Sequence, residues 1–538
     1  MSHGGSDAIA QDRNQGRSMV ISRNGIVAAE SPLAAQAGVQ ILERGGNAVD
    51  AAVAANAMMG LVAPMSNGSG GDLFAIVYDA KSGKLYGLNA SGWAPAGLTI
   101  EFLKNQGFHD MPEQGVQSVT VPGAVDGWQK LLDRFGKKKL SEVLAPAIRT
   151  AEDGFPVTEW ISGLWAANAE FLRGNEAAAR TYLPDNKPPA LGQIFRNADL
   201  ARSLRLIAQG GRDAFYKGEI AKSIVETSRR HGGTLAEKDF AEFSSEWVDP
   251  ISTTYRGWRV YEMPPNSQGL AALEMLNIME TFPLDKSGLN TAATLHTMIE
   301  AKKLAYADLI RYIGDPKFST LPVSQLLSKE FATARAKQID PNKANCNVGP
   351  ATSLPGSSTI YLSTVDRDGN MVSLIQSNYR GMGSGIVVPG LGFMFQDRGE
   401  LFSMDPQHAN VYAPGKRPFH TIIPGFVMKD GKPWEAFGVM GGGMQPQGHV
   451  QVLSNQIDFG LNVQEAGDAS RWQHEGDNEP TGEKMTESGG YVEVESGIPY
   501  ETVRELRKKG HDVRFDVGGY GGYQAIKVEM HDGQRVYV

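Results

Sequence analysis

The feature that most constrains this chain is a junction at residues 356–366, where the sequence is Gly-Ser-Ser-Thr-Ile-Tyr-Leu-Ser-Thr-Val-Asp. A run rich in Asn, Gly, Pro and Ser (345–355) precedes it. Apolar and polar residues then alternate, which is typical of a strand. An Arg-Asp-Gly-Asn turn (367–370) and a second alternating run (371–375) predict a β-hairpin. The chain is therefore expected to pass directly from an open loop into a strand that begins with a hydroxyl residue.

A junction of this kind suits a precursor that cuts its own chain. Cleavage in front of Thr359 would place a free α-amine and a hydroxyl on one residue, so that the amine could serve as the base for the hydroxyl. An α-amino group has a pKa of about 7.7–8.0, so a useful fraction is neutral near neutral pH. The ordinary alternative is that a Ser/Thr cluster after Gly and Pro is only a loop that enters a strand.

The composition narrows the class of protein. A chain of 538 residues with 41% apolar and 21% charged residues is typical of a globular protein, and its net charge of −8 argues against a general nucleic-acid-binding protein. The single cysteine, Cys346, excludes an internal disulfide and argues against a cysteine-based metal site. Residues 1–20 lack an apolar secretory signal, and no run of about 18 apolar residues suggests a membrane span, so a cytoplasmic enzyme without membrane contact is expected.

Capping residues and glycines divide the rest of the chain. Ser31 before Pro32 predicts a helix start, and Asn47 caps a second helix. The Gly-rich segment 67–71 lacks the G-x-G-x-x-G pattern and leads into a strand, which argues against a nucleotide-phosphate loop. The expected elements are a strand over 20–29, helices over 32–44 and 48–60, strands over 73–78 and 84–89, mostly helices over 140–330, strands from 359 to about 437, and a helix over 450–459.

Five segments, taken together and in order, resemble the γ-glutamyltranspeptidase family of N-terminal-nucleophile hydrolases. They are the Gly-rich segment 67–71, the Val-Pro-Gly turn 121–123, the strand from Thr359, the segment 383–387, and the pair Gly441-Gly442. In the third segment, the residues that match the family's small-subunit pattern are Ser363, Val365, Asp366, Gly369 and Asn370. The resemblance extends from about Val20 to the end of the chain.

The resemblance implies an α+β fold, the four-layer αββα sandwich of the N-terminal-nucleophile hydrolases, built from two autoprocessed subunits. It places a large subunit at 19–358 and a small subunit at 359–538, both in one sandwich domain, and the residues before them, 1–18, are expected to be a disordered lead. No cofactor or metal is expected, because the family's mechanism needs neither. The expected partners are a small-molecule amide or γ-glutamyl-like substrate and the chain's own second fragment, with a dimer of such heterodimers left open.

The resemblance also implies the catalytic residues Thr359, Ser377, Gly441 and Gly442. Thr359 takes the place of the nucleophile, and Ser377 that of a threonine that hydrogen-bonds the nucleophile and assists processing. The adjacent glycines would hold an oxyanion with their backbone N–H groups, and their missing Cβ atoms leave room for it. The ordinary alternative for the glycine pair is a simple tight turn.

The residues that hold a γ-glutamyl group in the family are changed here. Ser91 stands in place of an Arg, Leu401 in place of an acidic residue, and His420 and Thr421 in place of two serines. A zwitterionic substrate end needs one cation and one anion, and both are missing from these positions. Arg398 is therefore expected to select a substrate that bears a carboxylate, because its planar fork matches one. The other substrate-binding candidates are Asn378, Tyr379, Asp397, His420 and Thr421.

Three interpretations of function remain open. The first is an autoprocessed threonine hydrolase whose acyl-enzyme is released by water. The second is a conventional γ-glutamyltransferase or glutathione hydrolase with relocated substrate anchors. The third is an unprocessed, non-catalytic homologue, favoured by Ile360 and Tyr361, where the family has Thr and His. Arg398, likewise, could form only a structural ion pair with Asp397 or Glu400.

Overall fold

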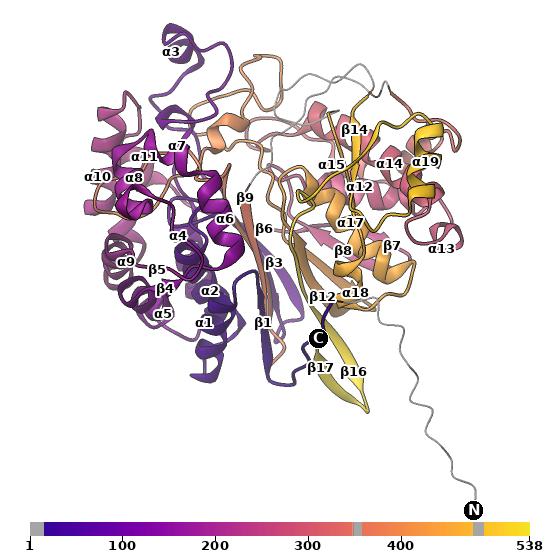
Figure 1. Cartoon of the computed structure of the whole chain (residues 1–538), viewed down its shortest axis with the longest axis horizontal. Coiled ribbons are helices and arrows are strands. Elements are labelled where there is room, and N and C mark those ends of the chain that lie inside the picture. Colours follow the sequence, from indigo (N-terminus) through magenta and orange to yellow (C-terminus); the bar gives the residue numbers. More distant parts are fainter. Residues whose placement is uncertain (1–15, 347, 349–357, 477–488) are drawn as a thin grey trace, which may run out of the picture.

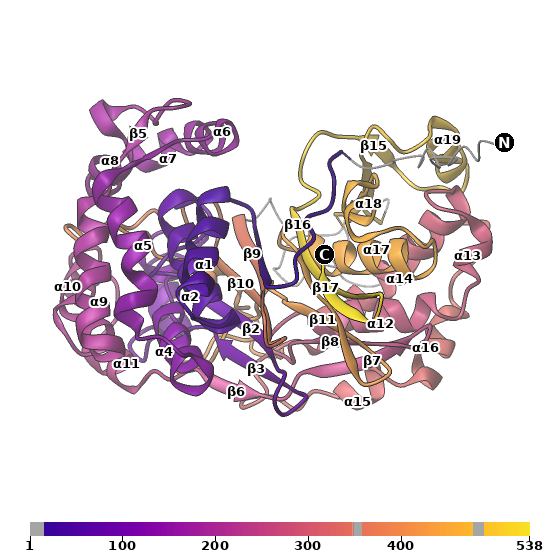
Figure 2. The ribbon, with the colours of Figure 1, turned by 90° about the horizontal axis from the view of Figure 1, so that it is seen from below.

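Two antiparallel sheets lie face to face, and helices cover the outer face of each (Figure 1, Figure 2). The protein is described from a computed structural model, which covers residues 16–346, 348, 358–476 and 489–538. The four-layer αββα sandwich expected from the resemblance is confirmed. Two of the predictions fall largely outside the described residues. They concern residues 1–15 of the lead expected at 1–18, and most of the open loop expected before the junction.

The first sheet carries the junction strand near its centre. Strand β9 pairs with β1 on one side and β10 on the other, so Thr359 lies at the start of an interior strand. The strands, in spatial order, are β1 (Gly25–Ala29), β9 (Ser358–Asp366), β10 (Met371–Tyr379), β2 (Asp72–Asp79), β3 (Lys84–Ala90) and β6 (Glu246–Val248).

The second sheet packs against the first through apolar side chains such as Phe74, Tyr361 and Ile526. Because apolar residues on the facing sides of both sheets are buried, this layer excludes water from the space between them. The strands, in spatial order, are β17 (Gln534–Tyr537), β16 (Tyr523–His531), β12 (Lys432–Val439), β11 (Gly425–Lys429), β8 (Trp258–Glu262) and β7 (Ile251–Tyr255). The described residues also form two small sheets. One pairs β4 (Phe155–Pro156) with β5 (Ile194–Phe195), and the other contains β13 (Trp472–Glu475), β14 (Tyr491–Val494) and β15 (Val513–Phe515).

Helices cover the first sheet on its outer face, where the alanine-rich α2 is buried along almost its whole length. This layer contains α1 (Pro32–Glu43), α2 (Ala48–Val62), α4 (Ala124–Phe135), α5 (Leu140–Asp153), α6 (Glu159–Ala167), α7 (Ala169–Arg173), α8 (Glu176–Tyr182), α9 (Ala198–Tyr216), α10 (Glu219–Arg230) and α11 (Glu237–Glu242). Outside it are α3 (Ile100–Asn105) and the 3₁₀ turns η1 (Val116–Ser118), η2 (Pro184–Asn186) and η3 (Arg398–Leu401).

A second helical layer covers the other sheet (Figure 2). It is formed by α12 (Gly269–Met279), α13 (Leu284–Ser287), α14 (Ala292–Tyr312), α15 (Val323–Leu326), α16 (Lys329–Ala336), α17 (Met444–Ile457), α18 (Val463–Asp468) and α19 (Tyr500–Lys508). No helix in the described ranges is long and apolar enough to cross a membrane.

The predicted hairpin is confirmed as β9 and β10, and Asp366 stabilises its turn. The Asp366 Oδ1 atom accepts hydrogen bonds from the backbone N–H groups of Gly369 at 2.9 Å and Asn370 at 3.0 Å. Its Oδ2 atom accepts one from the N–H of Ala48 at 3.0 Å, which ties the turn to the start of α2. Asn47 caps that helix as expected, through a capping box.

Several predicted boundaries were wrong. The first strand begins at Gly25, not at residue 20, because the preceding residues lie along the end of the chain and Ser22 bridges to Tyr537. Helix α17 begins at Met444, six residues before the prediction, because Pro446 lies in the first turn, where proline is tolerated.

The parts of the chain before and after Thr359 form both sheets together. The first sheet takes β1, β2, β3 and β6 from the earlier part and β9 and β10 from the later part. The second takes β7 and β8 from the earlier part and its other four strands from the later part. The two parts therefore share one core, whether or not the chain is cut between them.

Candidate active site

Thr359, Ser377 and Asp72 lie side by side on neighbouring strands of the first sheet. Thr359 of β9 pairs in register with Ser377 of β10, which pairs in turn with Asp72 of β2. The Thr359 hydroxyl donates a hydrogen bond to Ser377 Oγ at 3.2 Å, and Thr359 is only 4% exposed. The two residues are in contact as expected, while their catalytic roles remain a prediction.

The Thr359 side chain faces the second sheet. Ser363 lies on the same face of β9, since side chains alternate along a strand, and its hydroxyl donates to the carbonyl of Ala436 at 3.2 Å. Tyr361, between them on that face, packs so closely on Gly438 that a Cβ there would lie 2.4 Å from its ring. The same spacing places Thr359 beside the residues that follow the end of β12.

Gly441 and Gly442 form the turn between β12 and α17. Their φ angles of +115° and +60° lie in the left-handed region that glycine adopts readily. The Gly441 carbonyl accepts a hydrogen bond from the N–H of Met444 at 3.0 Å, and the Gly442 carbonyl accepts one from the Gln268 side chain at 2.8 Å. Within the described part of the chain, the N–H groups of both glycines donate to no acceptor. Two amides are thus available at the N-terminus of α17, where the helix dipole favours negative charge.

A β-bulge at the end of β10 shapes the site next to Thr359. The register between β9 and β10 shifts after Ser377, and Tyr379 has a φ angle of +79°. The N–H of Tyr379 donates to Ser377 Oγ at 2.7 Å. Asn378 and Tyr379 are fully buried, and the Asn378 Oδ1 atom and the Tyr379 hydroxyl have no partner among the described residues. Bulges often redirect side chains beside active sites, and this one presents two unused polar groups.

Arg398 is a buried cation in the 3₁₀ turn η3. Its Nη1 atom donates to the Thr421 hydroxyl at 2.7 Å, and its guanidinium lies 4.7 Å from the centroid of the Tyr379 ring. Its Nε and Nη2 atoms have no partner among the described residues. Burial lowers the pKa of Arg398 to about 10, so the side chain stays charged at neutral pH. Arg398 therefore offers two unused, charged donors inside the protein.

The ion-pair alternative for Arg398 is wrong for the carboxylates that the structure describes. Glu400 pairs with Arg380, whose Nε atom lies 2.8 Å from Glu400 Oε2. Asp397 accepts a hydrogen bond from the backbone N–H of Arg380 at 3.2 Å. Burial, reinforced by Glu400, raises the pKa of Asp397 well above its usual range. Both carboxylates thus contact Arg380, and neither forms an ion pair with Arg398 among the described residues.

His420 forms a buried pair with Asp72. The His420 Nε2 atom lies 3.0 Å from Asp72 Oδ2, and both residues are fully buried. The Asp72 Oδ1 atom accepts backbone N–H bonds from Gly92 at 3.0 Å and Gly123 at 3.1 Å. Burial raises the pKa of Asp72 to about 7 and holds the pKa of His420 well below its usual range. The Nδ1 atom of His420 has no partner among the described residues.

Ser91 and Leu401, which are expected to stand in place of the family's charged anchors, are part of the fold. The Ser91 hydroxyl donates to Asn89 Oδ1 at 2.7 Å, and the Ser91 carbonyl accepts a hydrogen bond from Arg417. Arg417 also donates to Glu246 at 3.1 Å, so its guanidinium is already bound. Leu401 is fully buried in the core behind the second sheet.

Two contributors to the site were not identified from the sequence. Asp72 directly follows the Gly-rich segment 67–71, and an acidic residue that opens a buried strand could have marked it. The glycines let that segment approach β10, since a Cβ at Gly71 would lie 2.8 Å from the Ser377 carbonyl oxygen. Gln268, which donates to the carbonyls of Gly442 and Thr421, carries no local signal.

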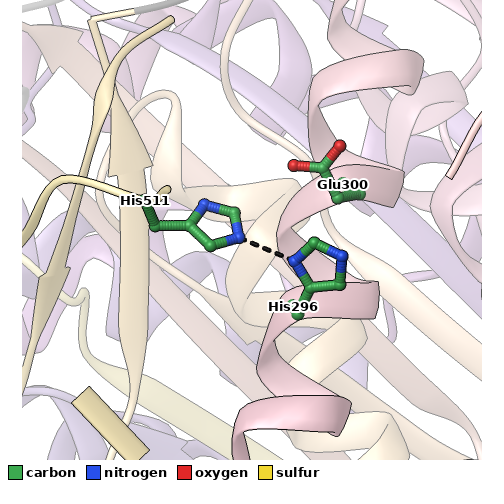
Figure 3. Close-up of side chains that lie close together, drawn as sticks. All are labelled: His296, Glu300 and His511. Atoms are coloured by element: carbon green, nitrogen blue, oxygen red, sulfur yellow. Dashed lines mark hydrogen bonds between the residues drawn. The ribbon is translucent and has the colours of Figure 1, made fainter. Parts of the chain in front are cut away.

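A separate group of His296, Glu300 and His511 resembles a set of metal ligands (Figure 3). The His296 Nδ1 and His511 Nε2 atoms are 2.8 Å apart and share a hydrogen bond. Glu300 already pairs with Lys303 at 2.8 Å and accepts the N–H of Asn345 at 3.1 Å. Burial lowers the pKa of both histidines. The group therefore forms a hydrogen-bonded link between α14 and the segment after α19.

Comparisons with known proteins agree with this architecture. The family model described as Gamma-glutamyltranspeptidase matches residues 34–537. The glutathione hydrolase-like YwrD proenzyme of Bacillus subtilis (strain 168) is 37% identical over 518 residues, which cover 95% of each chain. The glutathione hydrolase proenzyme of Escherichia coli (strain K12) is 35% identical over 528 residues, which cover 95% of this chain and 89% of that protein.

Among solved structures, the cephalosporin acylase from Bacillus halodurans matches with a TM-score of 0.89 at 44% identity. The match covers 99% of this chain and 96% of that one, so the two proteins share one fold. The family model and these relatives cover nearly the whole chain, and the chain therefore belongs to the γ-glutamyltranspeptidase family, as an enzyme of the N-terminal-nucleophile hydrolase type.

Proposed function

We propose that this chain is an autoprocessed threonine hydrolase in which Thr359 attacks the amide bond of a small substrate. The position of Thr359 carries the proposal, because it opens an interior strand, is buried, and has its hydroxyl 3.2 Å from Ser377 Oγ. Cleavage between Ser358 and Thr359 would yield fragments 1–358 and 359–538. The names of two relatives as proenzymes support this step.

In the proposed reaction, the free α-amine of Thr359 takes the proton of its own hydroxyl as Oγ1 attacks the amide carbonyl carbon. The N–H groups of Gly441 and Gly442 stabilise the developing oxyanion, an effect worth about 2.7–4 kcal/mol per donor in known enzymes. The amine then returns the proton to the leaving nitrogen, and an ester between Thr359 and the acyl group remains. Water, deprotonated by the same amine, hydrolyses that ester and releases the acid.

The acyl group of the substrate is proposed to carry a carboxylate that Arg398 binds. Two unused donors on a buried guanidinium suit a carboxylate, which they can bind through charge-assisted hydrogen bonds. Neighbouring strands are about 4.8 Å apart. Asp72, which contacts His420, lies two strands from Thr359 and therefore about 10 Å away from it. A short acyl chain would span the distance from the nucleophile to this end of the site. The names of the relatives, a glutathione hydrolase and a cephalosporin acylase, support a small-molecule substrate.

The two fragments are proposed to remain associated after cleavage. Each sheet contains strands from both sides of the cut, so separation would expose the core between the sheets. The reaction as proposed uses only protein groups and water.

Denaturing electrophoresis and mass spectrometry test the processing step. Purified protein should give two bands, and the smaller fragment should begin at Thr359. A single intact chain after long incubation would refute the proposal, and so would a small fragment that begins at another residue. Turnover is tested by nitroaniline release from glutaryl p-nitroanilide, with butyryl p-nitroanilide as the matched substrate that lacks the carboxylate. Faster release from the neutral compound would contradict the role of Arg398.

A further inference from the structure

We infer that a pocket between strands β1 and β16 binds a small organic cation, an ammonium group on an apolar body. Two residues of its lining, Glu30 and Gln524, each have a buried side-chain oxygen without a partner among the described residues. The described residues that line the pocket do not include the proposed catalytic residues. The inference therefore goes beyond the proposed function and does not depend on it.

The pocket has the size and the lining of a small-molecule site. Its volume is about 700 Å³, and such sites are typically about 300–1,000 Å³ and mostly apolar with a few polar groups. The apolar part of the wall includes Ile26 and Ala28 of β1, Pro32 and Ala35 of α1, Val463 of α18 and Ala525 of β16. A ligand that fills this space therefore needs an apolar body.

Glu30 and Gln524 enter the pocket from different sheets. Side chains alternate along a strand, so Glu30, two residues after Ala28, follows the face of β1 that packs toward the second sheet. Gln524 pairs with Gly438 of β12, and the Tyr361 ring packs on Gly438 from the first sheet. Directly paired residues lie on the same face, so Gln524 faces the first sheet. The two side chains thus approach one pocket from opposite sides.

The unpartnered oxygens are both hydrogen-bond acceptors. Glu30 Oε2 and Gln524 Oε1 are buried and have no partner among the described residues. A buried acceptor that stays unsatisfied costs about 1–3 kcal/mol, and more if it is charged. An N–H group of a ligand can satisfy either oxygen, and an ammonium group offers three such donors.

The charges of the lining favour a cation. The charged side chains that line the pocket are Glu30, Asp468 and Arg17, so carboxylates outnumber cations. Arg17 donates to Gln464 at 3.3 Å, and no ion pair joins it to Glu30 among the described residues. Burial raises the pKa of Glu30 to about 7. A bound ammonium group would supply the missing opposite charge, and its attraction to Glu30 is stronger there than in water.

Two compounds of similar shape test the choice of ligand. 4-Phenylbutylamine, which is protonated at pH 8, and the neutral 4-phenylbutanol are titrated into the full-length protein at that pH by calorimetry. The Kd of the amine should be about 10- to 100-fold lower than that of the alcohol, as expected for one charge-assisted hydrogen bond. Equal Kd values, or an amine that does not bind, would overturn the inference.

A substitution of Glu30 shows whether the amine binds in this pocket. Glu30→Gln removes the charge and keeps the shape, so the Kd of the amine should rise to about that of the alcohol, while the Kd of the alcohol should not change. Glu43→Gln is the matched control, because Glu43 is an exposed glutamate at the end of α1 and does not line the pocket. A Glu30→Gln protein that binds the amine as tightly as the wild type would refute the site.

A crystal structure of the wild type with 4-phenylbutylamine decides the matter even if Glu30→Gln does not fold. The ammonium nitrogen should lie within about 3.2 Å of a Glu30 carboxylate oxygen, and the phenyl ring should contact the apolar wall of the pocket. An amine found only at another place on the protein would overturn the inference.

Discussion

At the scale of single residues, the site depends on a few buried polar atoms that the fold leaves unused. The Thr359 hydroxyl lies on the same sheet face as Ser363 and is held by Ser377 at 3.2 Å. If this one oxygen attacks first the chain's own peptide bond and later the substrate, processing and turnover must respond together to its removal.

Substitution of Thr359 tests this dependence. Thr359→Ala should stay as one intact, inactive chain, because it lacks the attacking oxygen. Thr359→Ser should process and keep measurable activity, because it retains both the hydroxyl and the future amine. Electrophoresis and anilide hydrolysis measure the two effects. Processing or full activity in the Ala variant would remove Thr359 from the mechanism.

Arg398 should affect turnover without affecting processing. Arg398→Ala should lower kcat/KM for a glutaryl anilide by about 10- to 100-fold, the loss of a charge-assisted bond of about 1.5–3 kcal/mol. Butyryl anilide, which has no carboxylate, should be hydrolysed as by the wild type. Arg504→Ala, which removes an exposed arginine paired with Glu501, is the matched control. Equal losses on both anilides would assign Arg398 to the scaffold.

At the scale of elements, the site is assembled at the start of β9 and the ends of β10 and β12. The bulge at Ser377–Tyr379 and the turn before α17 both use backbone conformations with positive φ angles. The carbonyl groups of the turn accept hydrogen bonds from Met444 and Gln268, while its amides donate to no acceptor among the described residues. This is the arrangement that an oxyanion hole requires.

Gly441→Ala should damage catalysis more than stability. Its φ angle is +115°, and an added Cβ would lie 3.1 Å from the Met444 Cβ atom, so the turn must shift. If this shift moves the Gly441 N–H group away from the oxyanion, kcat should fall by about 10²–10³-fold. Gly460→Ala is the matched control, because Gly460 also has a positive φ angle, +71°, but no atom near its Cβ position. Equal kcat values for the two variants would argue against the oxyanion role.

At the scale of the whole molecule, one core joins the chain segments on both sides of Thr359. Each sheet contains strands from before and after the junction, and a layer of apolar side chains lies between the two sheets. Buried ionisable groups make the stability of this core depend on pH. Glu435 is the clearest case, since it is fully buried and accepts hydrogen bonds from Gln456 at 2.9 Å and Tyr523 at 2.8 Å.

Glu435 should stabilise the fold more at low pH than at high pH. Burial raises its pKa from 4.5 to about 7, so between these values the folded state binds a proton that the unfolded state does not. Its contribution is complete below the lower value and is lost as the pH rises through the higher one. The Tm of the wild type minus that of Glu435→Gln should therefore be larger at pH 5.5 than at pH 8. A difference that is constant, or that grows with pH, would contradict this assignment.

Much of the local structure followed from the sequence by itself. Alternation and the turn at 367–370 predicted the hairpin, because Asp366 can bond the turn amides directly, and Asn47 marked the start of α2. The start of a strand at Thr359 was likewise visible. The start of α17 was not visible in the sequence, because glycines precede Met444 and a proline lies in the first turn of the helix.

The contacts that give the site its chemistry were decided only by the tertiary structure. Asp72 and His420 are 348 residues apart, and no local pattern relates them. Asp397 and Glu400 lie next to Arg398 in the sequence, yet Glu400 pairs with Arg380, so Arg398 remains available. The alternation of apolar and polar residues along a strand indicates which of its faces is buried, because each side chain is buried or exposed according to the face on which it lies. Which polar atoms meet on that face depends on the order of the strands and on the bulge in β10, and these exist only in the folded sheet.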